Sequence, residues 1–116
     1  MKTVSAHIRD HLLITVEPKR MPDLETLQRT ENCPEFDRLC LYRMIMGSFR
    51  YGLIGRRPGK PEYDRVASMI ARLEKYKDDR NAEHLLDVAN LAKIEYVEGD
   101  HLGVMPINDG THTRTK

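Results

Sequence analysis

Residues 82–97 read AEHLLDVANLAKIEYV and decide the fold. They predict a helix that ends before Gly99, with a rotation of about 100° per residue. On such a helix one side is apolar and carries Leu85, Val88, Ala89, Ala92 and Tyr96. A polar stripe lies nearly opposite and consists of Glu83, Asp87 and Asn90. Because a helix that is apolar almost all round is normally buried, we expect this stripe to need partners.

Two roles are open for the polar stripe. Carboxylates are costly to bury unless they are paired, protonated or bound to metal. In the first role Glu83 and Asp87 bind Mg²⁺ or Mn²⁺, because hard oxygen ligands suit these ions. In the second role the two acids form a structural ion network with Arg72, Lys75 or an arginine of the loop at 47–60. The residues of the stripe are compatible with both.

Two further helices are predicted around this one. A helix over 61–79 begins with Pro61 in its first turn and forms an antiparallel hairpin with 82–97. Its predicted core face has the helical i, i+3, i+4, i+7 spacing and consists of Tyr63, Val66, Ala67, Ile70, Leu73 and Lys77. A helix over 34–47, opened by Asn32 and Pro34, packs across the hairpin. Its predicted core face consists of Phe36, Leu39, Cys40, Met44 and Gly47.

The remaining segments are short or irregular. Residues 12–16 are β-prone and end before Pro18, so they form either a short strand or the end of a helix that begins near Ser5. Residues 99–116 are predicted to be an irregular tail, with His112 as a candidate for function. The sequence thus predicts a mainly α fold in one domain, 1–116, with an N-terminal segment 1–31, a helical core 32–98 and the tail.

Composition excludes several classes of protein. The 116 residues suit a single domain, and no stretch approaches the roughly 20 apolar residues of a membrane span. A net charge of +1 excludes a broad basic field for nucleic acid. The first ten residues contain no apolar signal segment, so a cytoplasmic location is expected. Cys33 and Cys40 are about 10.5 Å apart along a helix, too far for a disulfide, and are expected to be reduced.

The stretch 47–60 is predicted to be a long connection, because it holds four of the seven glycines. Arg56, Arg57 and Lys60 lie just before the predicted start of a helix, and Arg50 lies a few residues earlier. Helix N-termini and arginine side chains both favour phosphate. The stretch is therefore either a phosphate-binding loop or a solvated basic turn.

Residues 68–76 and 83–95 resemble small phage and prophage proteins, and also the C-terminal half of the MazG-type all-α nucleoside triphosphate pyrophosphohydrolases. The resemblance covers about residues 60–98. It implies a dimer in which acidic residues hold Mg²⁺ against nucleotide phosphates, and it implies the host cytoplasm if the protein is phage-encoded. This chain has Glu83-xxx-Asp87 where that superfamily has ExxD, lacks EExxE, and offers Glu74 as a partial replacement.

Three hypotheses of function follow. In the first hypothesis the protein is a nucleotide pyrophosphohydrolase that depends on Mg²⁺ or Mn²⁺. Its metal is held by Glu83, Asp87 and Glu74, and Asn90 orients water or sugar. The phosphates would be bound by Arg50, Arg56, Arg57 and Lys60. In the second, a non-catalytic phage-type protein sequesters a nucleotide or blocks a host protein. In the third, the chain is a structural oligomer with an ion network; a dimer is expected in any case, because C₂ symmetry is the commonest.

Overall fold

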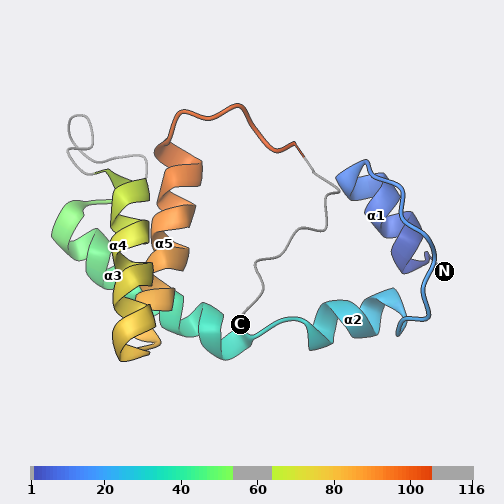
Figure 1. Cartoon of the computed structure of the whole chain (residues 1–116), viewed down its shortest axis with the longest axis horizontal. Coiled ribbons are helices and arrows are strands. Elements are labelled where there is room, and N and C mark those ends of the chain that lie inside the picture. The colour runs from blue at the N-terminus through green and yellow to red at the C-terminus, as the bar shows by residue number, and fades with distance from the viewer. Residues whose placement is uncertain (1, 54–63, 106–116) are drawn as a thin grey trace. The chain divides into compact units, whose positions relative to one another are not determined.

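The computed structural model describes residues 2–53 and 64–105, and this part of the chain is mainly helical, as predicted (Figure 1). Its helices are α1 (Val4–Leu12), α2 (Leu24–Thr30), α3 (Pro34–Tyr51), α4 (Arg65–Asp79) and α5 (Glu83–Glu98). No strand occurs within these described ranges, and none of the helices in them is long and apolar enough to cross a membrane. Contacts divide the chain into two units, residues 33–101 and residues 1–32 with 102–116.

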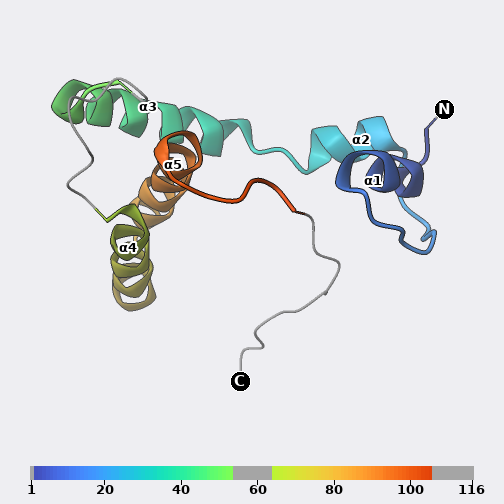
Figure 2. The same ribbon diagram turned by 90° about the horizontal axis from the view of Figure 1, so that it is seen from above.

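In the unit of residues 33–101, α5 is the central helix. It contacts α4 along the predicted antiparallel hairpin and contacts α3, which crosses the hairpin (Figure 2). The hairpin turn is fixed by left-handed Arg80, whose N–H donates to the carbonyl of Tyr76 at 2.8 Å. In the same turn the carboxylate of Asp79 accepts from the N–H of Asn81 at 2.8 Å. That hydrogen bond is the main reason why the pKa of Asp79 is lowered.

Helix α4 begins four residues later than predicted. Asp64 has extended backbone angles and is the N-cap, because its side chain accepts from the N–H of Ala67 at 3.0 Å. The predicted first turn at Pro61 falls in residues 54–63, outside the described part of the chain. An aspartate whose carboxylate satisfies a free N–H of the first turn is a strong helix start, so Asp64 rather than Pro61 sets the boundary.

Asp64→Ala is expected to lower the free energy of unfolding by about 1 kcal/mol, because it removes the N-cap of α4. In a domain of this size that loss corresponds to a fall of roughly 4–8 °C in the unfolding midpoint, measured by circular dichroism. Asp78→Ala is the matched control, since Asp78 is exposed at the other end of the same helix. Equal losses in the two variants would contradict a capping role.

Helix α3 is longer than predicted. It passes through Gly47 and ends at Gly52, which has a φ of 96° and donates its N–H to the carbonyl of Ser48 at 2.9 Å. One glycine inside a helix costs only about 1 kcal/mol, which the flanking apolar turns outweigh. The prediction of a loop from residue 47 is therefore wrong for residues 47–51, and Arg50 lies in the last turn of α3.

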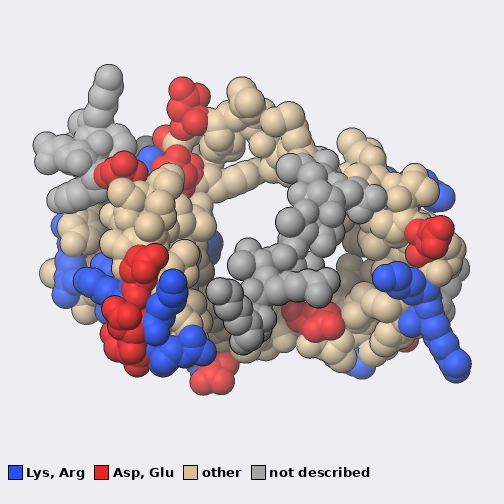
Figure 3. Space-filling model, in the orientation of Figure 1, with Lys and Arg blue, Asp and Glu red and all other residues tan. Residues whose placement is uncertain are grey.

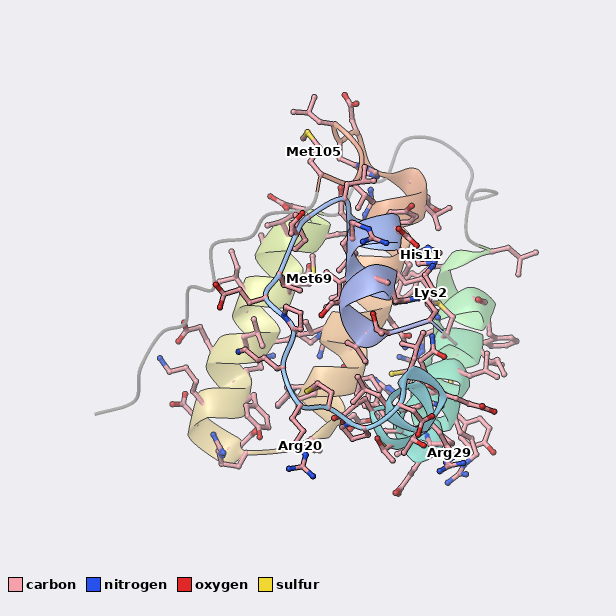
Figure 4. All side chains as sticks on the ribbon, turned by 90° about the vertical axis from the view of Figure 1, so that its right-hand side faces the viewer. Lys2, His11, Arg20, Arg29, Met69 and Met105 are labelled. Atoms are coloured by element: carbon pink, nitrogen blue, oxygen red, sulfur yellow. The ribbon has the colours of Figure 1, made fainter. Side chains whose placement is uncertain are left out.

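The apolar face of α4 does not form the predicted core. Val66 and Ile70 are 51% and 56% exposed, and Leu73 is exposed as well. The less exposed side of α4 carries Arg65, Ser68, Met69, Arg72 and Tyr76. Figure 4 shows the side chain of Met69 on the side of α4 that faces α5. The predicted face is wrong because two arginines of α4 form ion pairs with α5 and fix the other side of the helix inward.

The faces of α5 and α3 are also divided differently from the prediction. On α5, Leu85 and Tyr96 are exposed, whereas Asp87 and Asn90 of the polar stripe point inward. On α3, Cys40 is buried and Met44 and Gly47 are half-buried, as predicted, but Phe36 and Leu39 are exposed. Within the described residues Cys40 is the one buried apolar side chain. The half-buried apolar residues of α5 are Leu86, Val88, Ala89, Leu91 and Ile94, so this unit has a thin apolar interior in which large apolar side chains are at most half-buried.

In the other unit, residues 4–12 form a helix, so a helix that begins near Ser5 is found, but it ends at Leu12 and residues 13–16 lie beyond it. Thr3 caps α1, and left-handed Leu13 ends it. Residues 13–16 form no strand, because a β-prone run needs a neighbouring strand and the described ranges hold none. Lys2 forms an ion pair with Asp10 at 2.9 Å and lies beside His11 (Figure 4).

Helix α2 was not predicted. Its N-cap is Asp23, whose carboxylate accepts from the N–H of Thr26 at 3.0 Å and from the hydroxyl of Thr26 at 2.7 Å. The two hydrogen bonds lower the pKa of Asp23. Asp23 after Pro22 is a helix-start signal that sequence reasoning missed, because α2 is only 7 residues long.

Candidate functional site

The most buried polar side chain of the described residues is Asn90, at 7% exposure. Its Nδ2 donates to the backbone carbonyl of Cys40 at 2.8 Å. Cys40 is the buried residue of α3, so this hydrogen bond joins α5 to α3 at a site shielded from solvent. Asn90 thus takes a structural position in which its amide links two helices.

Asp87, one turn before Asn90, lies between two arginines from two different helices. Its Oδ1 accepts from Nε of Arg43 on α3 at 3.2 Å, and its Oδ2 is 3.1 Å from Nη1 of Arg72 on α4. Nη1 of Arg43 also reaches Oε1 of Glu83 at 3.1 Å. We call Arg43, Arg72, Glu83 and Asp87 the Asp87 network. It ties all three helices together.

The Asp87 network is electrically balanced, with two guanidinium groups and two carboxylates. The side chain of Asp87 is 13% exposed, whereas those of Arg43 and Arg72 are 36% and 40% exposed. The carboxylate is therefore shielded from water while the arginines reach the surface. The pKa of Arg43 is raised, chiefly by its hydrogen bond to Asp87. On the face drawn in Figure 3, acidic and basic side chains likewise lie next to one another over α4.

The pairing of Asp87 with Arg72 is one of the contacts that the ion-network alternative predicted. The partnership with Arg43 was missed, because the predicted core face of that helix was built from apolar residues and glycine alone and left Arg43 out. Its spacing contained a signal: Cys40, Arg43, Met44 and Gly47 follow i, i+3, i+4, i+7 and share one face. A basic residue on that face was a candidate partner for the acids of the stripe.

Of the predicted metal ligands, the structure brings Glu83 and Asp87 together and leaves Glu74 apart from them. Glu83 and Asp87 converge on one cationic group, the guanidinium of Arg43. Glu74 is exposed on α4, and within the described ranges no three His, Cys, Asp or Glu side chains are placed to hold a metal ion. A divalent cation at Glu83 and Asp87 would have to displace Arg43.

The predicted phosphate-binding residues are divided by the boundary of the described chain. Arg50 is exposed in the last turn of α3. Arg56, Arg57 and Lys60 lie outside the described residues, as does His112.

A second set of ion pairs fixes the open end of the hairpin. Nε of Arg65 is 2.9 Å from Oε1 of Glu95, and its Nη1 is 3.5 Å from Oε2 of Glu98. The side chains of Arg65 and Glu98 are nearly buried. Sequence reasoning missed this set, although residues equally far from the turn of an antiparallel hairpin face each other, which brings the start of α4 to the end of α5.

The two cysteines are free thiols in different environments. Cys33 is exposed, whereas Cys40 is buried, and burial raises the pKa of the Cys40 thiol. Because the thiolate is the nucleophile, one thiol per chain is expected to react rapidly with an aromatic disulfide reagent and the second only after unfolding. Cys33→Ser should abolish the rapid phase. A rapid phase that persists in this variant would contradict the burial of Cys40.

No family model, curated protein or solved structure matches this chain. The resemblance of residues 68–76 and 83–95 to MazG-type enzymes therefore stays a prediction.

Proposed function

We propose that this chain is a non-catalytic assembly protein whose working form is a homo-oligomer. One observation carries the proposal: in the described part of residues 33–101, three polar or charged side chains lie in the interior while many large apolar side chains are exposed to solvent. Asp87, Asn90 and Arg65 are buried or nearly buried. The exposed apolar side chains include Tyr42, Ile45, Phe49, Val66, Ile70 and Tyr96.

The energetics of burial support this proposal. Covering a large apolar side chain contributes about 1.5–3 kcal/mol, and the described residues bury only Cys40 in this way. The polar contacts offset little of the deficit, because ion pairs with exposed members contribute about 0–1 kcal/mol each. A unit built in this way gains stability when another surface covers its apolar faces. A second copy is the partner that is present wherever the chain is made.

The Asp87 network has a definite role in such an assembly. It holds α3, α4 and α5 in one arrangement without consuming their apolar faces, since its contacts lie on the inward sides of the helices. Buried polar groups that fix the arrangement of helices are best attested in helical assemblies. The Asp87 network therefore fixes the packing of α3, α4 and α5, and the outward apolar faces of these helices stay available for association.

Sedimentation equilibrium of the full chain at several concentrations tests the proposed function. The expected result is a mass that is a multiple of 13.5 kDa. A specific oligomer with a micromolar Kd would be saturated at a chain concentration of about 100 times that Kd. The proposal is overturned if the mass is that of one chain at every concentration up to this value. Glu83→Gln, at the exposed rim of the Asp87 network, is the control and should leave the mass unchanged.

A second candidate function is Mg²⁺-assisted binding or hydrolysis of a nucleotide. The observation that favours it is the convergence of Glu83 and Asp87 on one cationic group, Arg43. In this proposal a divalent ion takes the place of that guanidinium, and Glu74, Asn90, Arg50, Arg56, Arg57 and Lys60 have the roles that the sequence suggested.

Titration with Mn²⁺, followed by its electron paramagnetic resonance signal, tests the second candidate. Stoichiometric binding that is lost in Asp87→Asn and strengthened in Arg43→Ala is the result it predicts. The second candidate is contradicted if the free-ion signal is unchanged by the wild type, by Asp87→Asn and by Arg43→Ala, and if no pyrophosphate is released from nucleoside triphosphates. Neither result depends on the oligomeric state.

A further inference from the structure

The outward side of α3 carries an apolar seam with the spacing of a coiled coil. Leu39, Tyr42, Met46 and Phe49 are three, four and three residues apart, which is the a-d-a-d pattern of a heptad repeat. All four side chains are exposed, Tyr42 at 57% and Phe49 at 89%. We call these four residues the α3 seam. It extends over the eleven residues 39–49, or about 15 Å of helix.

The α3 seam is not used by the other helices of its own unit. The residues of α3 that are buried or half-buried are Cys40, Arg43, Met44, Gly47 and Ser48. Cys40 and Arg43 bind α5 directly, through Asn90 and Asp87. On a helical wheel the centre of the five buried or half-buried residues lies about 150° from the centre of the α3 seam, so α5 and most of the seam occupy different sides of α3.

Charge at the two ends of the α3 seam selects a partner and an orientation. Glu35 lies in the first turn of α3 and Arg50 in the last, and both are exposed. In an antiparallel pair of α3 helices with the two seams in register, Arg50 of each copy lies at the level of Arg38 of the other and within about one turn of the acidic residues Glu35 and Asp37. A parallel pair would place like charges together. An antiparallel pair also pairs each a position with a d position, so that Leu39 meets Phe49 and Tyr42 meets Met46.

We propose that α3 forms an antiparallel, two-fold contact with α3 of a second copy through the α3 seam. This inference rests on the proposed self-assembly and specifies the surface that makes it. The contact is isologous, because every pairing occurs twice about the two-fold axis, and it therefore closes as a dimer. It covers the most exposed large aromatic side chain of the helix, Phe49.

Sedimentation equilibrium of two matched glutamate variants of the full chain tests the α3 seam. Tyr42→Glu places a charge in the seam and is expected to raise the dissociation constant by at least about tenfold, because a carboxylate would be buried without a partner. Val104→Glu, at an exposed apolar position outside the unit of residues 33–101, should leave it within about twofold, as expected for a change outside the interface. Circular dichroism shows that each variant is folded.

A charge-exchange cycle tests the orientation independently of the seam. Glu35→Arg and Arg50→Glu should each weaken association by about two- to fivefold, the range of exposed ion pairs, and together restore it. The inference is supported if Tyr42→Glu weakens association and if the double variant Glu35→Arg with Arg50→Glu associates as the wild type does. A wild-type oligomer that is indifferent to Tyr42→Glu, or a double variant that is not restored, overturns the inference alone. A monomeric wild type overturns the proposed function as well.

Discussion

Asp87→Asn is expected to lower the free energy of unfolding of the full chain by about 2 kcal/mol, at a fixed chain concentration. The carboxylate of Asp87 is shielded from water, accepts a hydrogen bond from Arg43 and forms an ion pair with Arg72. Hydrogen bonds to charged groups contribute about 1.5–3 kcal/mol to stability. The expected value is below the 3–5 kcal/mol of a broken buried ion pair, because both arginines are more than one third exposed and stay solvated.

Urea unfolding followed by circular dichroism measures this loss. Glu83→Gln is the matched control, since Glu83 shares Arg43 with Asp87 but has a half-exposed side chain, and its loss should stay within about 1 kcal/mol. The opposite ranking would contradict the central place of Asp87. A gain in stability in Asp87→Asn would favour the metal-binding candidate, because removal of a functional carboxylate often stabilises a protein.

Asn90→Asp is expected to destabilise the chain by about 2–3 kcal/mol at neutral pH. The change replaces an N–H donor with a carboxylate at 2.8 Å from the carbonyl of Cys40, at a site with 7% exposure. A buried charge that lacks a hydrogen-bond donor is costly, and two acceptors repel each other. Asn90→Ala should lose less, about 1–2 kcal/mol, because it removes the hydrogen bond without adding a charge.

The pH dependence of stability separates the two variants of Asn90. In Asn90→Asp, burial without a donor raises the pKa of the introduced carboxyl in the folded state above its unfolded value of about 3.9. The penalty is therefore absent below the unfolded pKa, grows as the pH rises, and is complete above the folded pKa. The excess loss of Asn90→Asp over Asn90→Ala should vanish or reverse in acid, where the protonated carboxyl carries an O–H that can donate to the carbonyl of Cys40. A difference that is constant with pH would contradict the contact with Cys40.

The hairpin was predictable because its signals are local. The periodicity of residues 82–97 and the turn residues before them gave a helix now found at Glu83–Glu98. The end of α3 and the existence of α2 were missed, since a glycine inside a helix and a helix of two turns both leave weak local signals. Local pattern thus predicts long helices better than their boundaries.

The packing faces were not predictable in the same way. The apolar side of α4 is evident from the sequence, but which side meets α5 depends on ion pairs between residues far apart in the chain, such as Arg65 with Glu95. The polar stripe of α5 was located correctly, and its partner Arg72 was one of the alternatives. Arg43 was missed, because an arginine 44 residues before Asp87 becomes a partner only through the packing of α3 on α5.

The unfolding midpoint as a function of chain concentration tests most directly the central claim that this helical unit completes its apolar core by self-assembly. Folding coupled to association makes the midpoint depend on concentration by mass action. The midpoint is expected to rise steadily between micromolar and submillimolar chain, and in Tyr42→Glu this rise should begin at a chain concentration at least about tenfold higher. A cooperative transition whose midpoint is the same at every concentration would contradict the claim.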